Sequence, residues 1–271
     1  MKKHKHVMDL ENRIYDSTFL GSFLQCQMKC YYEWVLGIEP VEPRPPLVFG
    51  TIMHEALYYL NKDKDVEKGL KCFDQLPKFI ADETRTKERG KLIFEGYVER
   101  WKNDEYNVRN LEVEFHLDMP GGSVFAGRID KIVDLDDLVY SWDYKTTKSM
   151  GLSFFKQFRP NLQIDGYCYA TRELVGSCAG CIIDGIQVAK TKQGFERDKS
   201  ERTEREMNAF PINYQKIVED VERALLKNRW IYNTKQCSMY GECIYKPLCL
   251  YGHNPLPCNF KYREVEPEVK E

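Results

Sequence analysis

The chain has 271 residues, of which 42% are hydrophobic and 13% aromatic, as in an ordinary globular protein. Its formal net charge of −2 is no sign of a nucleic-acid-binding chain, but it excludes none, because a local basic surface is sufficient for such binding. Ten cysteines are too few for a small disulfide scaffold and favour a reducing compartment with metal ligation. No signal peptide and no bilayer-spanning apolar run are predicted, so we expect a cytoplasmic protein without a membrane partner.

The first part of the chain is predicted to be a loosely ordered arm followed by a helix. We assign residues 1–16 to the arm and 17–37 to the helix, with Ser17 as its N-cap and Gly37 at its end. Four prolines in residues 39–46 predict an extended connector.

The next elements are predicted to be helical and then to change to strand. Thr51 is the expected N-cap of a helix that carries His54. Residues 64–105 follow as a largely helical stretch, and residues 111–117 are predicted to form a strand.

A β-hairpin that carries two acids and a lysine is the most informative segment. Residues 127–133 and 138–142 are predicted as its strands, joined by an acidic turn. Because side chains alternate across a strand, Asp143 and Lys145 share one face, and Asp130 can converge on the same place. Two such carboxylates can bind Mg²⁺, and the lysine can orient a water or stabilise charge on a scissile phosphate. The pattern therefore favours metal-dependent phosphodiester hydrolysis over a surface hairpin with solvated charges.

The last part of the chain is predicted to contain two helices, one strand and an irregular end. We expect a helix from about 153 to 174, a strand at 181–188, a charged loop at 190–206 and a helix at 214–228. Beyond residue 230, frequent glycine and proline exclude long regular structure, so this segment is expected to need a staple.

The hairpin and two flanking segments resemble the PD-(D/E)XK nuclease superfamily, whose core is an acid, a gap and then acid-x-lysine. Residues 49–54, Phe-Gly-Thr-Ile-Met-His, resemble the upstream histidine motif of its RecB-like branch. Residues 163–167, Gln-Ile-Asp-Gly-Tyr, resemble the downstream Gln-x-x-x-Tyr motif. Four motifs in the family's order are far more specific than one Asp-x-Lys. The resemblance implies an α/β (α+β) fold with a central mixed β-sheet flanked by helices, in one domain over 17–262 with a flexible tail at 263–271.

The resemblance also implies the roles of individual residues. Its catalytic set is Asp130, Asp143, Lys145, Gln163 and Tyr167, and its metal ligands are His54, Asp130, Asp143 and a supporting carboxylate, for which we choose Glu114 over Glu112. The metal is Mg²⁺ or Mn²⁺, and an imidazole ligand favours Mn²⁺. Without the resemblance, His54 could be an ordinary helix-surface histidine. Gln163 and Tyr167, four residues apart on one helix face, could simply belong to an amphipathic helix.

The spacing of four cysteines predicts a second metal site. Cys26 and the trio Cys237-x5-Cys243-x5-Cys249 resemble the iron–sulfur RecB-like nucleases, which include the AddB nuclease domain, the spacer-acquisition nucleases of CRISPR systems and phage-borne relatives. In that family four thiolates hold a [4Fe–4S] cluster, which here would tie residues 17–37 to residues 230–262. Thiolates select iron–sulfur clusters or zinc, so Zn²⁺ is the alternative. Cys30 and Cys258 are reserve ligands.

The expected function is exonuclease action on single-stranded or frayed DNA ends in recombination, repair or phage DNA processing. Lys148, Lys156 and Arg159 lie among phenylalanines and are candidates for tracking a single-stranded backbone, unless that helix only packs its phenylalanines inward. Helicase or recombination proteins are possible partners, in the cytoplasm of a bacterium or of a phage host. The alternative is a catalytically inactive DNA-binding or partner-docking module of the same fold.

Overall fold

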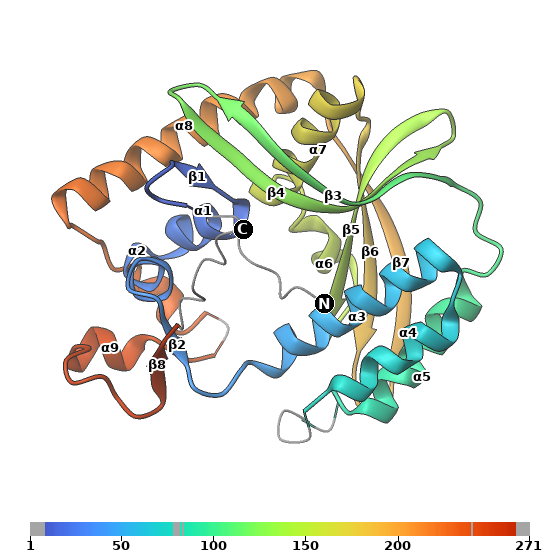
Figure 1. Ribbon diagram of the computed structural model, residues 1–271, viewed down its shortest axis with the longest axis horizontal. Helices are drawn as coiled ribbons and strands as arrows, with labels where there is room; N and C mark the ends of the chain where they lie inside the picture. Colours follow the sequence, from blue (N-terminus) through green and yellow to red (C-terminus); the bar gives the residue numbers. More distant parts are fainter. Residues whose placement is uncertain (1–8, 78–81, 83, 240, 264–271) are drawn as a thin grey trace, which may run out of the picture.

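A six-stranded mixed β-sheet with helices on both faces forms the centre of the protein in a computed structural model, which describes residues 9–77, 82, 84–239 and 241–263 (Figure 1). The strand order is β1-β4-β5-β6-β7, and β3 also pairs with β4. The β1–β4 and β5–β6 pairs are parallel and the others antiparallel. The strands are β1 (Ile14–Tyr15), β3 (Asn107–Met119), β4 (Ser123–Leu135), β5 (Leu138–Thr147), β6 (Gly180–Val188) and β7 (Gln193–Glu201). The predicted fold class is confirmed.

The helices form a layer on each face of this sheet. One layer contains α3 (Pro45–Asp63), α4 (Val66–Cys72) and α5 (Lys87–Arg100), whose apolar side chains pack on β5 and β6. The other contains α1 (Ser17–Gln25), α7 (Leu162–Val175) and α8 (Glu204–Lys227), which pack mainly on β3 and β4. The short α6 (Leu152–Lys156) links β5 to α7. Burial of these apolar faces supplies the main driving force for the three-layer arrangement.

A gap in the sheet sets the place of the site. Within the described sheet, β4 pairs with β1 at Val124 and Phe125 and with β5 from Lys131 onward. Residues 126–130 between these pairs have no strand partner on that edge, although β3 covers their other edge. In Figure 1 the β3–β4 hairpin accordingly curves away from the β5–β6–β7 strands. The backbone and side chains at the fork are therefore available for other contacts.

A small second unit joins the two ends of the described chain. Strand β2 (Ile38–Pro40) pairs antiparallel with β8 (Phe260–Tyr262), beside α2 (Gln27–Cys30) and α9 (Lys246–Tyr251) (Figure 1). Tyr32, Ile38, Tyr245, Leu248 and Phe260 form its buried core. The described end of the chain thus has a short strand and a buried core but no long regular element, as its glycine and proline content predicts; the need for a staple stays a prediction.

The predicted hairpin and two of the predicted strands are confirmed, with longer limits. Residues 111–117 lie inside β3, and residues 181–188 lie inside β6. Asp136 and Asp137 form the hairpin turn with φ of 52° and 61°, values that aspartate tolerates better than most residues. The predicted helical stretch 64–105 contains α4 and α5.

Several predicted limits near the start of the chain are wrong. The expected helix 17–37 ends at Gln25, because Cys26 is extended at φ −164°; α2 and a π-helical turn at Tyr31–Val35 follow. Its N-cap is Asp16, which accepts a hydrogen bond from Phe19 N, and not Ser17. Part of the expected arm is ordered, since β1 lies within it; residues 1–8 are outside the described residues.

Two helices begin earlier than predicted. Helix α3 begins at Pro45 within the supposed connector, because proline fits the first turn of a helix. Thr51 therefore lies inside α3, where its hydroxyl donates to Leu47 O, and does not cap it. Helix α8 begins at Glu204, where Thr203 and Glu206 form a capping box.

Two further predictions fail in the second half of the chain. The helix expected at 153–174 is divided into α6 and α7, with Pro160 between them and Asn161 as the N-cap of α7. The charged loop expected at 190–206 contains the edge strand β7, whose hydrogen bonds come from β6.

Candidate active site

Asp130 and Tyr144 meet at the fork between β4 and β5. The pairing of these strands stops at Lys131 and Trp142, so the backbone N–H of Tyr144 is free to donate to Oδ2 of Asp130 at 2.9 Å. This bond and the neighbouring His54 outweigh the effect of burial and lower the pKa of Asp130. Asp130 is therefore a carboxylate at neutral pH, fixed by the backbone of the opposite strand.

Asp143 and Lys145 point from β5 toward α7. Nζ of Lys145 lies 2.6 Å from Oδ2 of Asp143 as an ion pair, while it donates a hydrogen bond to Oε1 of Gln163 at 2.8 Å. Burial raises the pKa of Asp143, which has only 4% of its side chain exposed. Burial acts to lower the pKa of Lys145, but the Asp143 carboxylate raises it above its ordinary value. Lys145 is thus a fully charged ammonium between an acid and an amide.

Gln163 and Tyr167 lie one turn apart at the start of α7. Asn161 caps this helix by accepting hydrogen bonds from the N–H groups of Gln163 and Ile164. The Gln163 side chain bonds to Lys145 through its oxygen and donates from Nε2 to the Tyr167 hydroxyl at 3.2 Å. The structure therefore brings both residues of the Gln-x-x-x-Tyr segment to the Asp-x-Lys segment.

His54 reaches the fork from α3. Its Nδ1 is 3.2 Å from Oδ1 of Asp130, and its Nε2 is 2.9 Å from the carbonyl oxygen of Tyr144. Burial acts to lower the pKa of His54, but the Asp130 carboxylate raises it above the ordinary value. Two turns later on the same helix, Asn61 donates to the Tyr144 hydroxyl at 3.0 Å. Helix α3 thus holds Tyr144 at both its backbone and its side chain.

Glu112 is closer to the site than Glu114. Leu111 pairs with Lys131 and Val113 with Ile129, so Glu112 between them faces Asp130. Burial raises the pKa of Glu112, and the Asp130 carboxylate raises it further. Glu114 is exposed. The two acids alternate identically in the sequence, but Glu112 has φ of 48°, a local conformation that the sequence pattern does not reveal.

The residues at the fork have the donor chemistry of a hard-cation site. Apart from the Lys145 ammonium at 2.6 Å, the buried Oδ2 of Asp143 has no partner among the described residues, which leaves a lone pair of this carboxylate oxygen for a divalent ion. Asp130, Glu112 and His54 add oxygen and nitrogen donors nearby. In their present positions, no three His, Cys, Asp or Glu side chains of the described chain converge closely enough to hold a metal. Ligation would therefore require side-chain rotation, and the donor types fit Mg²⁺ or Mn²⁺.

The three predicted DNA-binding residues are all exposed but differ in their contacts. Lys148 follows the end of β5, and Lys156 ends α6. Arg159 makes a bidentate ion pair with Glu206, with N–O distances of 2.9 and 2.8 Å. Its guanidinium is thus engaged at the start of α8, and a DNA contact would have to compete with that pair.

The four predicted cluster cysteines come from separate elements near the second unit. Burial raises the pKa of Cys249 to about 11, and the thiols of Cys26, Cys243 and Cys237 add to the shift, so all four are neighbours. The N–H of Cys243 donates to the carbonyl of Cys237 at 2.9 Å. They too do not converge as a metal site among the described residues as they stand.

The two reserve cysteines differ from these four. Cys30 is buried in the main core, with its Sγ 4.0 Å from Phe19 O, and burial raises the pKa of its thiol. Cys258 is exposed.

Residues 18–250 match the family model described as the PD-(D/E)XK nuclease superfamily. A comparison with curated proteins found no match. Among the described residues, no helix has the length and apolar character needed to cross a membrane.

Two solved structures give an independent comparison of the fold. A crystal structure of a candidate exonuclease from Eubacterium rectale aligns with 89% of this chain and 94% of its own, with a TM-score of 0.54 and 12% identity. At this identity the likeness concerns the fold alone. The crystal structure of SSO0001 aligns with 74% of this chain and 84% of its own, at 16% identity and a TM-score of 0.33 that is too low to support an argument.

Proposed function

Because this chain belongs to the PD-(D/E)XK nuclease superfamily, we propose that it is a divalent-metal-dependent deoxyribonuclease that acts as an exonuclease on single-stranded or frayed DNA ends. The observation that carries this proposal is the meeting of Asp130, Asp143 and Lys145 at a fork in the sheet. There a buried carboxylate oxygen of Asp143 forms a 2.6 Å ion pair with the charged Lys145 and has no other partner among the described residues. An ordinary surface hairpin has no reason to bury these charges together.

Asp130, Asp143 and His54 are the proposed ligands of Mg²⁺ or Mn²⁺, and Glu112 replaces the expected Glu114 as the carboxylate that supports them. The bound ion supplies Lewis-acid polarisation of the scissile phosphate and lowers the pKa of a water. Lys145 stabilises the negative charge that develops on the phosphate and positions the attacking water.

Gln163 and Tyr167 have a positioning role in this proposal. The amide oxygen of Gln163 holds Nζ of Lys145, and the Tyr167 hydroxyl fixes the orientation of that amide. Such outer contacts limit the freedom of a catalytic group and keep it near its productive geometry.

The nucleic-acid substrate and cellular setting are the finer parts of the proposal. Exposed Lys148 and Lys156 next to the end of β5 supply local positive charge for a phosphate backbone. Arg159 would join them only by leaving Glu206. The exonuclease description of the Eubacterium rectale structure supports the same class of reaction here. Helicase or recombination proteins as partners, and action in a bacterial or phage-infected cytoplasm, complete the proposal.

The four predicted ligand cysteines are proposed to hold a [4Fe–4S] cluster, with Zn²⁺ as the alternative. Cys26, Cys237, Cys243 and Cys249 are all free thiols, and three of them act electrostatically on the fourth. Four thiolates from both ends of the chain are a suitable donor set for either group. A cluster would add ligation to the β2–β8 sheet that already joins these segments.

The nuclease proposal is tested on labelled single-stranded and double-stranded DNA with Mg²⁺, Mn²⁺ or EDTA. Wild-type protein should degrade single-stranded DNA in the presence of either ion, and EDTA should abolish this degradation. Asp143→Asn should lose cleavage by about 10²-fold or more. The matched control is Asp136→Asn on the same hairpin, an exposed turn residue with φ of 52° that asparagine also tolerates. A wild-type protein that binds DNA without cleaving it would identify an inactive module instead.

The cluster proposal is tested by metal analysis of freshly purified protein. Iron and acid-labile sulfide with a brown colour indicate a cluster, whereas zinc without colour indicates the alternative. Cys249→Ser should remove the bound group and increase proteolysis of the end of the chain. Cys178→Ser is the matched control, because Cys178 is buried in a separate apolar cluster, where its thiol donates to Gly180 O. Metal-free wild-type protein with full activity would contradict the proposal.

A further inference from the structure

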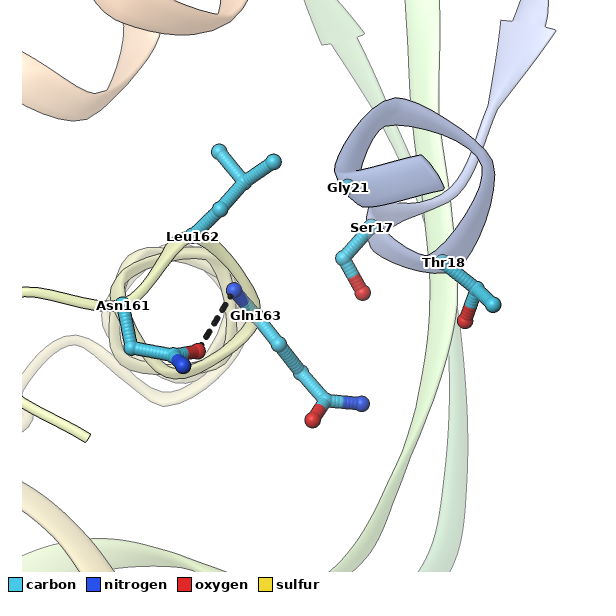
Figure 2. Close-up of a pocket in the computed structure, with 6 residues that line it drawn as sticks. All are labelled: Ser17, Thr18, Gly21, Asn161, Leu162 and Gln163. Carbon is cyan, nitrogen blue, oxygen red and sulfur yellow. Dashed lines mark hydrogen bonds between the residues drawn. The ribbon is translucent and has the colours of Figure 1, made fainter. Parts of the chain in front are cut away.

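A pocket of about 300 Å³ lies between the N-terminal turns of α1 and α7. It is lined by Ser17, Thr18, Gly21, Asn161, Leu162 and Gln163 (Figure 2). Figure 2 shows the Gln163 amide and the Ser17 hydroxyl directed toward the space between the two helices. Helix α1 follows directly after β1, which borders the gap in the sheet, so the pocket opens beside the fork.

The pocket adjoins the proposed reaction site through one shared side chain. Gln163 lines the pocket, and its Oε1 accepts the hydrogen bond from Nζ of Lys145 at 2.8 Å. A group seated in the pocket is therefore one side chain away from the ammonium that faces the scissile phosphate. A group this close to the ammonium could be a part of the substrate that is covalently attached to the scissile phosphate.

The lining chemistry favours an uncharged polar group over a phosphate. None of the six lining side chains is ionisable. The Asp16 carboxylate accepts from Phe19 N at the start of α1, and the Asn161 side chain accepts from Gln163 N and Ile164 N at the start of α7. These donors are therefore taken, and a negative charge already lies at the start of α1, which disfavours an anion there. Hydroxyls, amides and the apolar Leu162 instead suit the edges and face of a nucleobase and its sugar. The volume is at the lower end of small-molecule pockets, at about 300–1,000 Å³, and so suits one nucleoside and not several.

We propose that this pocket binds the nucleoside attached to the scissile phosphate, and that it thereby sets which bond of a DNA strand reaches Lys145. This inference rests on the proposed nuclease function and adds the substrate group that positions the strand. Because hydroxyl and amide groups can serve as donors or acceptors, the pocket accepts any of the bases with modest preferences.

Gly21 permits a direct test, because a Cβ at this position meets nothing within 4 Å. Gly21→Leu fills the pocket from within α1 without a clash at the Cβ, and Gly21→Ala, which occupies less of the space, should give a smaller loss in the same direction. Both substitutions favour the helical conformation over glycine, so neither should lower the thermal unfolding temperature. A loss of DNA affinity in Gly21→Leu is then not a loss of folding.

The substrates are single-stranded oligonucleotides with one abasic residue placed at successive positions. For wild type, the abasic residue next to the cleaved bond should lower kcat/KM about tenfold, in the range expected for loss of one base contact. Gly21→Leu should cleave the intact strand about tenfold less efficiently and should no longer distinguish it from that abasic strand. This non-additivity is the signature of a direct contact.

Fluorescence anisotropy with the same oligonucleotides and EDTA measures binding without cleavage. If wild-type protein cleaves nothing, the nuclease proposal fails, but the pocket still predicts one position in the scan where abasic substitution weakens binding in wild type and not in Gly21→Leu. The inference is overturned if Gly21→Leu matches wild type on the intact strand, or if it is weakened equally on intact and abasic strands at every position.

Discussion

Two clusters of ionisable side chains lie at strands β4, β5 and β6. In the site cluster, Asp143 and Lys145 face α7, and Asp130 lies at the fork next to His54 from α3. The rear cluster, Lys131, Asp184, Arg197, Tyr97 and Asp104, lies beneath α5. In the rear cluster Oδ2 of Asp184 accepts from the Tyr97 hydroxyl at 2.6 Å and from Arg197 at 2.8 Å. Arg197 also pairs with Asp104 and stacks 3.7 Å over the Trp101 ring.

Burial alone does not distinguish a reaction site from a structural charge network. Burial raises the pKa of both Asp143 and Asp184 and strongly lowers that of Lys131. The difference is access. Lys145 has 26% of its side chain exposed next to a pocket, whereas Lys131 is fully buried against the rings of Tyr106, Trp142 and Tyr144. A gap in the strand pairing opens one cluster, while helices and aromatic rings close the other.

The largest effect is expected from breaking the rear cluster. Arg197→Met removes the cation next to a fully buried carboxylate and should lower the free energy of unfolding by about 3–5 kcal/mol. Urea unfolding measures this loss, and the folded fraction should keep its DNA cleavage. Arg223→Met on α8, which removes an exposed pair with Asp220, is the control and should stay within about 0.5 kcal/mol. Lost cleavage in fully folded Arg197→Met would show that the two clusters are not separate in function.

The matching change in the site cluster should affect rate more than stability. Lys145→Met keeps the length of the side chain and removes its charge, so cleavage should fall by about 10²–10³-fold. The unfolding free energy should fall by less than in Arg197→Met, because the neighbouring Asp143 has a raised pKa and can take up a proton. Single-turnover cleavage gives the rate. Lys199→Met, which removes an exposed pair with Asp136, should cleave normally; equal losses in both variants would contradict the assignment.

A smaller effect, on metal affinity, is expected from a substitution of Glu112 at the edge of the site cluster. Glu112→Gln should weaken the apparent affinity for Mn²⁺ by about tenfold, as expected for an outer carboxylate that supports the ligands. The dependence of cleavage rate on Mn²⁺ concentration measures this shift. Glu114→Gln, two residues along the same strand, is the control. If Glu114→Gln has the larger effect, the original choice from the sequence is correct and the register argument is not.

The smallest effect is expected for an ion pair outside both clusters. Hydrogen bonds from Arg159 hold the pKa of Glu206 at about 2, below its ordinary 4.5. Glu206→Gln keeps the capping-box geometry and removes only the charge, so the unfolding free energy at neutral pH should fall by about 0.5 kcal/mol, as for other exposed pairs. Since the folded-state pKa is depressed, this contribution is complete above pH 4.5 and is lost as the pH falls toward 2. Wild type and variant should therefore converge in acid unfolding curves. A difference that persists at pH 2 would mean that the variant disturbs the cap itself.

The elements predicted best from the sequence are those in which apolar residues recur regularly or form runs, or in which the turn residues are distinctive. The hairpin of β4 and β5 combines apolar runs with an acidic turn, and both signals survive in the structure. Strand β7 was mistaken for a loop because it lies at the sheet edge, where strand residues need not be apolar. Its structure comes from the hydrogen bonds of β6, a tertiary effect that no local pattern contains. The Thr203–Glu206 capping box was present in the sequence and would have given the correct start of α8.

The sequence indicated which residues gather at the candidate site, but it did not indicate their contacts with one another. Motif order indicated His54, Asp130, Asp143, Lys145 and Gln163, and the structure brings them together. The choice between Glu112 and Glu114 depends on one backbone angle. The capture of Arg159 by Glu206 depends on two elements that meet only in the folded protein. Local sequence therefore supplied the chemical groups, while tertiary pairing decided which of them are available.

The pairing of β2 with β8 has a consequence for the time course of folding. The contacts between these strands join residues as far apart as Glu39 and Arg263, a separation of 224 positions along the chain. During synthesis from the N-terminus, β2 must therefore wait for almost the whole described polypeptide before it gains this strand partner. Contacts of such high sequence separation close large loops and slow folding. Among the described residues, the unit that carries the four cysteines is accordingly able to complete its native contacts only after all strands of the central sheet have been synthesised.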